Sequence, residues 1–464
     1  MQVLREGTGF QKLKSRQGGL FAMIHEIYKK PIRMGSVLKF TLPTIVMTLV
    51  QSLYSMVDGI FVANLIGESA LSALTLISPY FNILTAVAAM FASGGSAVVM
   101  KKMGEGRHRE ACEDFTMLML CNLLIGGIFT ITGTVFAGQL SGVFHASAEV
   151  SLYCKEYLFS YMFFAVFHLL FSNLEMYVIA SGGSGLAMFS SIFGGIFNIL
   201  FDYLLIKVFS MGMKGAAIAS GMGMMIPCLT MTVYFMRKKH MLHFAMPGFR
   251  PGILLKTASN GFSEFSGNLV SGVVMLLFNQ CMLRYAGEAG VAASTIIFYV
   301  FGFMSALYMG YMFGVSPLLS YFYGGNSREK LRKLRNISLF FIGLVAAVTT
   351  ICAVAGSESL VGIFAHPGTE AYLLAIRGNK LFSAALLLVG FNTFSSMLFT
   401  ALSNGLISAV ISFSRTFLFL IGAVVTLPVL WGLDGLWLAV PVSELMAAVL
   451  SFFFFEKYKK KYGY

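Results

Sequence analysis

The feature that most constrains this chain is a series of long apolar runs. A helix needs about 20 apolar residues to cross a hydrocarbon core about 30 Å thick, and only helices and closed barrels can satisfy their backbone groups there. The runs are too long and too evenly apolar for the alternating strands of a barrel. We therefore predict an all-α membrane protein with twelve transmembrane helices, over residues 36–58, 71–99, 112–138, 150–180, 186–206, 214–236, 255–283, 291–322, 336–356, 370–402, 405–428 and 434–455.

The composition agrees with a membrane protein and argues against an enzyme. Charged residues make up 11% of the 464 residues, whereas soluble domains carry about 25%. The six cysteines stand singly, without metal or redox spacing. The chain has no HExxH motif, no GxxxxGK[ST] motif and no serine nucleophile with a histidine partner. We therefore predict neither an enzyme nor an ATP-driven pump, so that any transport would be secondary and would need no cofactor.

Positive charge predicts the orientation of the helices. Most of the 33 Lys and Arg lie in the N-terminal tail, in the loops 101–109, 237–256 and 328–335, and in the tail 457–461. Because basic loops stay in the cytoplasm, we place both termini there, in a multi-pass protein of the plasma membrane. The net charge of +13 is split among short loops, so we expect no nucleic-acid partner.

An offset of 220 residues relates the two halves of the chain. The segment GESALSALT at 67–75 corresponds to GEAGVAAST at 287–295, and Gly104 after the second run corresponds to Gly324 after the eighth. Such internal repeats are typical of transporters that rock two bundles about a central site. Since each repeat holds six spans, both enter the membrane in the same direction. A pseudo-twofold axis along the membrane normal should therefore relate two six-helix lobes.

The repeat divides the chain into five segments. We predict a cytoplasmic tail at 1–35, an N-lobe at 36–236, a cytoplasmic inter-lobe loop at 237–254, a C-lobe at 255–456 and a basic cytoplasmic tail at 457–464. We expect a monomer surrounded by membrane lipids. The role of the N-terminal tail stays open.

Two spans of the N-lobe carry polar side chains along one helical face. Asn198 and Asp202 are four residues apart in the fifth span, and Gln51, Tyr54 and Asp58 are three and four apart in the first. A charge at the bilayer centre costs on the order of 3 kcal/mol or more, so an ionisable group there is a functional candidate. We therefore predict that these residues form a site.

The depths of these residues bring them together in the outer half of the membrane. At about 1.5 Å per residue, Asp202 and Asp58 lie at similar heights, and Tyr157 and Ser220 reach that level from the outer side. The equivalent C-lobe positions hold no acid, so folding alone does not explain the two aspartates. Two neighbouring carboxylates in a low dielectric cannot comfortably both ionise. This predicts a cation site; a hydrogen-bonded pair that only fixes helix packing is the alternative.

Three motifs resemble a known family. LPTIVMTLVQSLYSMVDGIFVANLIGESALSAL in the first span, NILFDYLLI in the fifth and WGLDGLWLAVPVSEL near the end together resemble the multidrug and toxic compound extrusion (MATE) family, in the subgroup with an Asn and Asp pair on the fifth helix. The resemblance covers nearly the whole chain from Met34. It implies two lobes around a V-shaped cleft, and export of cationic or amphipathic drugs in exchange for H⁺ or Na⁺.

The resemblance also implies roles for individual residues. The first helix would bend at Pro43, although a static kink at the helix entry is the alternative. Sodium, where it is the coupling ion, would bind at Asp58, Asn198 and Asp202. The N-lobe cation site as a whole would comprise Asp58, Tyr157, Asn198, Asp202 and Ser220.

The substrate site is less closely defined. Our candidates to line the cleft and attract organic cations are Gln51, Tyr54, Glu264 and Glu444, with inter-helix hydrogen bonds as the alternative for the two glutamates. A flippase for lipid-linked or other endogenous substrates is the competing function, which would need a cleft richer in Lys and Arg. Four further polar residues stay open between binding and pairing with neighbours: Glu175, His168, Arg377 and Arg415.

Overall fold

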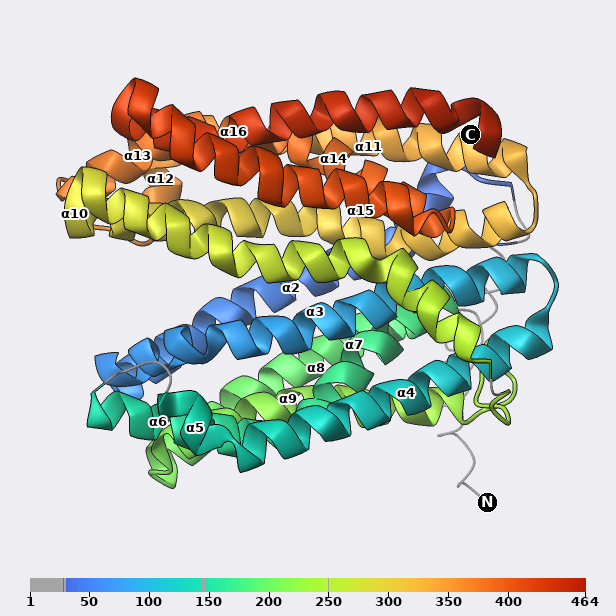
Figure 1. The fold of residues 1–464 in the computed structure, drawn as a ribbon, viewed down its shortest axis with the longest axis horizontal. Coiled ribbons are helices and arrows are strands. Elements are labelled where there is room, and N and C mark those ends of the chain that lie inside the picture. The colour runs from blue at the N-terminus through green and yellow to red at the C-terminus, as the bar shows by residue number, and fades with distance from the viewer. Residues whose placement is uncertain (1–27, 29–30, 143–146, 249) are drawn as a thin grey trace, which may run out of the picture.

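The computed structural model describes residues 28, 31–142, 147–248 and 250–464, and side chains within these ranges except at 55–60, 63, 64, 68, 71 and 140–142. Over this part of the chain the regular structure is entirely helical. Most of the predicted N-terminal tail lies outside the described residues. Figure 1 shows two groups of roughly parallel helices, one from each half of the chain, which we call the N-lobe and the C-lobe.

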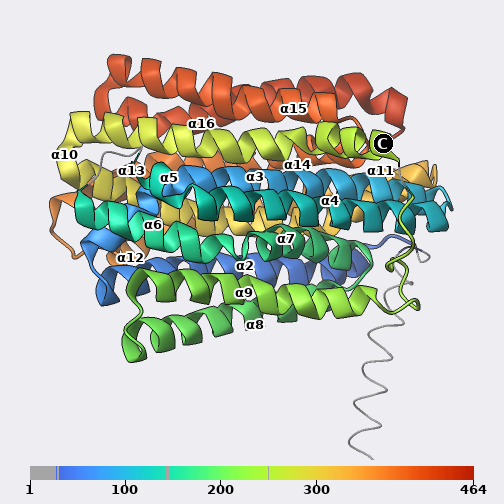
Figure 2. The same cartoon turned by 60° about the horizontal axis from the view of Figure 1, so that its bottom comes forward.

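The N-lobe contains helices from the first half of the chain. In chain order they are α2 (Met34–Leu65), α3 (Glu68–Gly104), α4 (His108–Val135), α5 (Ala137–Gly142), α6 (Ala148–Met162), α7 (Ala165–Ala180), α8 (Ser184–Asp202), the π-helix η1 (Tyr203–Val208) and α9 (Gly212–Phe235). Figure 2 shows α8 and α9 side by side at the edge of this lobe.

The C-lobe follows the same order of long and short helices. It contains α10 (Pro251–Gly324), α11 (Arg328–Ala355), α12 (Ser357–Gly362), α13 (Glu370–Phe382), the 3₁₀ turn η2 (Ser383–Ala385), α14 (Leu386–Ala401), α15 (Gly405–Phe413), the π-helix η3 (Ser414–Phe419) and α16 (Leu420–Tyr462).

The helices account for the predicted twelve spans. Among the described residues nine helices are long and apolar enough to cross a membrane, or ten when the bent pair α6 and α7 counts as one span. Two of these spanning segments contain a sharp turn: α10 turns at Gly287 (φ 59°), and the segment Gly405–Tyr462, which comprises α15, η3 and α16, turns at Gly432 (φ 58°). Each of these two segments is therefore a pair of spans, and the predicted twelve-helix, two-lobe fold is confirmed.

The fourth span differs from the uniform helix predicted over 150–180. It bends by 56° between Met162 and Ala165. The hydroxyl of Thr130 on α4 donates a hydrogen bond of 2.8 Å to the carbonyl oxygen of Met162. A neighbouring helix thus satisfies a backbone group that the break releases, which is what makes a broken helix tolerable in a membrane.

The internal repeat is visible in the backbone. Helices α4 and α11 begin 220 residues apart and end 220 residues apart, and so do α5 and α12. Left-handed glycines recur at the same offset, at Gly67 and Gly287 and at Gly212 and Gly432. These positive φ values favour glycine because a Cβ would be strained there. The chain reverses direction at the same places in both lobes.

The lobes meet at the end that we predict to face the cytoplasm. A Cβ added at Gly104 would lie 2.0 Å from the carbonyl oxygen of Tyr321, and one added at Gly324 would lie 2.0 Å from that of Lys101. The largest hydrophobic cluster draws side chains from both lobes, including Val99 of α3 and Val315 of α10. The other two clusters each belong to a single lobe.

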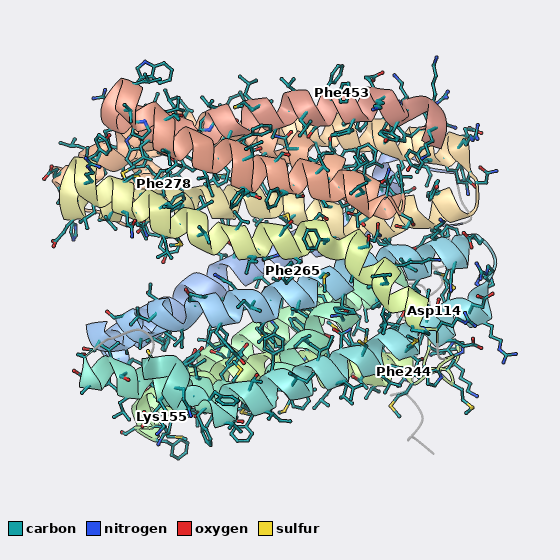
Figure 3. The ribbon with its side chains drawn as sticks, viewed as in Figure 1. Asp114, Lys155, Phe244, Phe265, Phe278 and Phe453 are labelled. Carbon is teal, nitrogen blue, oxygen red and sulfur yellow. The ribbon has the colours of Figure 1, made fainter. Side chains whose placement is uncertain are left out.

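The opposite end is therefore where the lobes have separate cores. Lys155 lies at this end, and Asp114 lies at the end where the lobes meet (Figure 3). Phe265 of α10 lies between the lobes in the same view. An arrangement joined at one end and divided at the other leaves room for a central cavity.

Candidate functional site

A pocket in the N-lobe brings together three of the predicted cation-site residues. It has a volume of ≈ 200 Å³, and its walls include Tyr157 of α6, Asn198 of α8 and Ser220 of α9. Tyr54 of α2 lines it as well. Together with Phe81 of α3, residues of five helices thus converge on one space.

Two glycines let α8 and α9 approach closely beside this pocket. A Cβ at Gly194 would lie 2.5 Å from the carbonyl oxygen of Gly223, and a Cβ at Gly223 would lie 2.9 Å from the Cβ of Asn198. The close contact holds Asn198 against α9. The Oδ1 atom of Asn198 and the hydroxyl of Ser220 are both buried and have no hydrogen-bond partner among the described residues. Oxygen atoms of this kind suit a small hard cation.

Asp202 lies one helical turn beyond Asn198. It is fully buried, with 0% of its surface exposed, and it is the last residue of α8 before the π-helix η1. Short π-helical stretches within α-helices are frequent at functional sites. The backbone of Asp58 lies in α2, whereas its side chain lies outside the described residues. The predicted pairing of the two aspartates therefore stays a prediction.

A larger cavity of ≈ 520 Å³ lies between the lobes, and we call it the inter-lobe cavity. Three of the four predicted cleft residues line it: Gln51, Tyr54 and Glu264. Tyr54 and Met224 line both this cavity and the N-lobe pocket, so the two spaces are neighbours. The wall contains several methionines: Met176, Met224, Met309, Met312 and Met397.

Glu444 does not line the inter-lobe cavity. It is buried on α16, where its Oε1 accepts a hydrogen bond of 2.8 Å from Nε of Arg415 and its Oε2 accepts one of 2.7 Å from Nδ2 of Asn392. Arg377, whose role the sequence leaves open, pairs with Asp434 at the lobe surface. Both contacts bring together residues that are far apart in sequence.

Glu175 of α7 lines the cavity, a placement that sequence reasoning left open. Its Oε1 accepts hydrogen bonds of 3.0 Å from Nε2 of Gln51 and 2.5 Å from the hydroxyl of Ser191. His168, two helical turns earlier, also lines the cavity, with its Nδ1 atom 2.8 Å from the hydroxyl of Tyr161. The sequence feature that could have predicted this placement is the seven-residue spacing, which puts Glu175 and His168 on one helical face.

A charged network at the end where the lobes meet was not predicted. Arg250, just before α10, lies 2.9 Å from Glu110 and 2.6 Å from Glu113, both on α4. Asp114 is fully buried and pairs with Lys102. The network therefore ties the start of the C-lobe to two helices of the N-lobe.

Comparison with known proteins settles the family. The family model for MatE matches residues 43–204 and 266–426, one segment in each lobe. The chain belongs to the MatE family. As a MatE protein it is a membrane transporter and not an enzyme, as the sequence predicted.

Relatives and solved structures agree with this assignment. The multidrug export protein MepA of Staphylococcus haemolyticus (strain JCSC1435) is 24% identical over 420 residues, which cover 90% of this chain and 92% of the relative. MepA of Staphylococcus aureus (strain MRSA252) is 22% identical over 338 residues, covering 72% and 74%. A crystal structure of MATE in complex with MaL6 matches with a TM-score of 0.87 at 20% identity, over 92% of this chain and 97% of that one. An outward-facing multidrug resistance MATE family transporter matches with the same TM-score and identity over 92% and 96%.

Proposed function

We propose that this MatE transporter exports cationic and amphipathic compounds in exchange for H⁺ or Na⁺. The observation that carries the proposal is the contact between two spaces. A buried acid, Asp202, lies beside the residues of the N-lobe pocket, and that pocket shares Tyr54 and Met224 with the inter-lobe cavity. An ion in the one and a substrate in the other would influence each other directly.

The chemistry of the inter-lobe cavity favours organic cations. Its described lining residues include two carboxylates, Glu175 and Glu264, and no Lys or Arg. Methionine is adaptable, so a Met-rich wall can pack against substrates of different shape. A lipid-linked pyrophosphate would lack a cationic partner in this cavity. This charge balance supports drug export over the competing flippase, as does the multidrug export activity in the names of the MepA relatives.

Helix α2 provides a route from the ion to the lobes. It carries Tyr54 at the N-lobe pocket, and about two to three turns earlier the hydroxyls of Thr48 and Thr44 donate hydrogen bonds of 2.8 and 2.6 Å to the backbone of α10. Pro43 is adjacent to this contact. A bend of α2 at Pro43 would change the contact between the lobes.

Exchange requires that the two ligands favour different arrangements. We propose that a cation at Asp58, Asn198 and Asp202 favours one arrangement of the lobes and that substrate favours another. Each then displaces the other through its differential affinity, with a coupling free energy of typically about 1–3 kcal/mol. We further propose that a monomer with both termini in the cytoplasm performs this cycle in the plasma membrane.

The test is gradient-driven uptake of dansylcadaverine, a fluorescent monocation, into inside-out vesicles. A proton gradient and a sodium gradient are imposed in turn, and the wild type is compared with Asp202→Asn. We expect accumulation with one ion in the wild type and only gradient-independent equilibration in the variant. The matched control is Asp434→Asn, the same chemical change at the partly exposed partner of Arg377.

Two results would contradict the proposal. If Asp202→Asn accumulates dansylcadaverine as the wild type does, Asp202 is a packing residue. If wild-type vesicles show no uptake under either gradient, the exporter function itself is wrong.

A further inference from the structure

The C-lobe contains a cavity that the proposed function does not use. It has a volume of ≈ 300 Å³ and we call it the C-lobe chamber. Its wall is rich in hydroxyl groups, from Ser263, Ser271, Ser305, Ser396, Ser412 and Thr416. The Oγ atom of Ser305 is buried and has no hydrogen-bond partner among the described residues. A buried hydroxyl without a partner is costly unless a ligand or water completes it.

The C-lobe chamber borders the inter-lobe cavity. Both spaces are lined by Glu264, Asn268, Met309 and Thr393. A substrate held between the lobes would therefore lie next to the chamber. Glu264 lies on the boundary of the two spaces.

Arg415 is the cation of this chamber. Its Nε donates to Glu444 and its Nη1 donates a hydrogen bond of 2.9 Å to the hydroxyl of Thr393. A guanidinium has five N–H groups, so three have no acceptor among the described residues. The π-helix η3 carries Arg415 at a position that lines the chamber, and π-helical stretches are frequent at functional sites.

Fold stability alone does not account for the pair formed by Arg415 and Glu444. At the repeat offset of 220 the equivalent N-lobe residues are Gly195 and Met224, so a six-helix bundle of this type folds without the pair. Apolar residues in place of a buried ion pair are often neutral or stabilising. The charges are better explained by a ligand than by packing.

The hydrogen-bonding groups define the ligand. Arg415 keeps N–H donors beyond its contacts with Glu444 and Thr393, and Glu264 lines both the chamber and the inter-lobe cavity. A substrate that carries both an ammonium and a carboxylate can place one group at each of these side chains. Its ammonium would pair with Glu264, and its carboxylate would accept hydrogen bonds from the remaining N–H groups of Arg415, a geometry that guanidinium and carboxylate favour.

We propose that the C-lobe chamber is a subsite for the carboxylate of zwitterionic substrates. The proposal rests on the proposed export function and narrows its substrate class. It makes Arg415 a specificity residue, which favours amphipathic amines with a carboxylate over the same amines without one.

The test uses two fluorescent ligands that differ by one carboxylate. Nε-dansyl-L-lysine is a zwitterion, and dansylcadaverine is the same molecule without the carboxylate. The readout is the ratio of their dissociation constants for purified protein in nanodiscs. We expect the preference for dansyl-lysine to fall by about tenfold or more in the double variant Arg415→Gln/Glu444→Gln, because a charge-assisted hydrogen-bonded pair is lost. The double variant leaves neither member of the ion pair charged and alone.

A second variant keeps the test decisive if the double variant does not fold. Arg415→Lys keeps a cation beside Glu444 but loses the planar fork, so we expect a smaller fall in the same ratio. Arg377→Gln, at the other Arg pair of the C-lobe, should leave the ratio at its wild-type value.

Three results would overturn the proposal. They are a wild type that binds dansyl-lysine more weakly than dansylcadaverine, a ratio that Arg415→Lys leaves unchanged, and an equal change of the ratio in Arg377→Gln. Gradient-driven transport of dansylcadaverine by the same protein shows separately whether the export function holds.

Discussion

The contact between Gly104 and Gly324 makes a sharp prediction about the lobe arrangement. A Cβ at Gly324 would lie 2.0 Å from the carbonyl oxygen of Lys101 and 2.8 Å from its carbonyl carbon. Ordinary van der Waals contact between a Cβ and another heavy atom begins near 3.4 Å. Because the contacted atoms belong to the backbone of α3, no side-chain rotation can relieve the overlap. Gly324→Ala must therefore move the ends of α3 and α10 apart by about 1.4 Å, the difference between these distances.

The expected magnitude follows from the cost of overpacking. Extra methyl groups in well-packed sites cost typically about 1–3 kcal/mol, and this cost falls only on the arrangement in which these ends touch. A change of this size shifts the equilibrium between two arrangements by roughly 5- to 150-fold. We therefore expect Gly324→Ala to populate an arrangement in which the lobes separate at this end.

The assay is the distance between spin labels on the two lobes. Labels are placed at Arg109→Cys and Arg332→Cys, in a background without the six native cysteines. Arg109 lies in the first turn of α4 and Arg332 in the second turn of α11. We expect a longer-distance population in Gly324→Ala. The matched control is Gly302→Ala on the same helix, where no atom lies within 4 Å of the added Cβ. Indistinguishable distance distributions for the two variants would refute the reasoning.

Two further predictions concern the charged network near that end. Asp114→Asn removes a fully buried carboxylate that neutralises Lys102. We expect the free energy of unfolding to fall by about 3 kcal/mol, as measured by thermal unfolding. The control Glu329→Gln, at the exposed pair with Lys333, should lower it by less than about 0.5 kcal/mol. Hydrogen bonds from Arg107 hold the pKa of Glu110 below its ordinary value of 4.5. The pair therefore stabilises the fold above pH 4.5 and loses this effect as the pH falls through the lower pKa of the folded state. The difference in melting temperature between wild type and Glu110→Gln should shrink over that acid range. A difference that grows there would contradict the pairing of Glu110 with Arg107.

Hydropathy and the repeat offset were enough to predict the architecture. Each apolar run must become a helix in a membrane, and the sharp turns at Gly287 and Gly432 fall in the short joints between predicted spans. The i, i+4 spacing of Asn198 and Asp202 also fixed their common face before any tertiary contact was known. These features depend on the local sequence and on the membrane as solvent, so a single sequence is enough to predict them.

Features that depend on a neighbouring helix could not be predicted in this way. The break at Met162 has no proline or glycine in its own span, and it is tolerated because Thr130 of another helix bonds the released carbonyl. Glu444 was expected in the cleft, but its partner Arg415 is 29 residues away on the preceding span. Tertiary packing therefore determines the direction of the Glu444 side chain.

The two lobes contain related spaces that carry different charged groups. Phe81 lines the N-lobe pocket, and Phe301, its counterpart at the 220-residue offset, lines the C-lobe chamber. The N-lobe space has a buried acid beside it, whereas the C-lobe space contains Arg415. Both share lining residues with the inter-lobe cavity. Neither charge has a counterpart in the other lobe, so folding of the repeat does not require it. These departures from the repeat support our two proposals, a coupling cation in the N-lobe and a substrate carboxylate in the C-lobe.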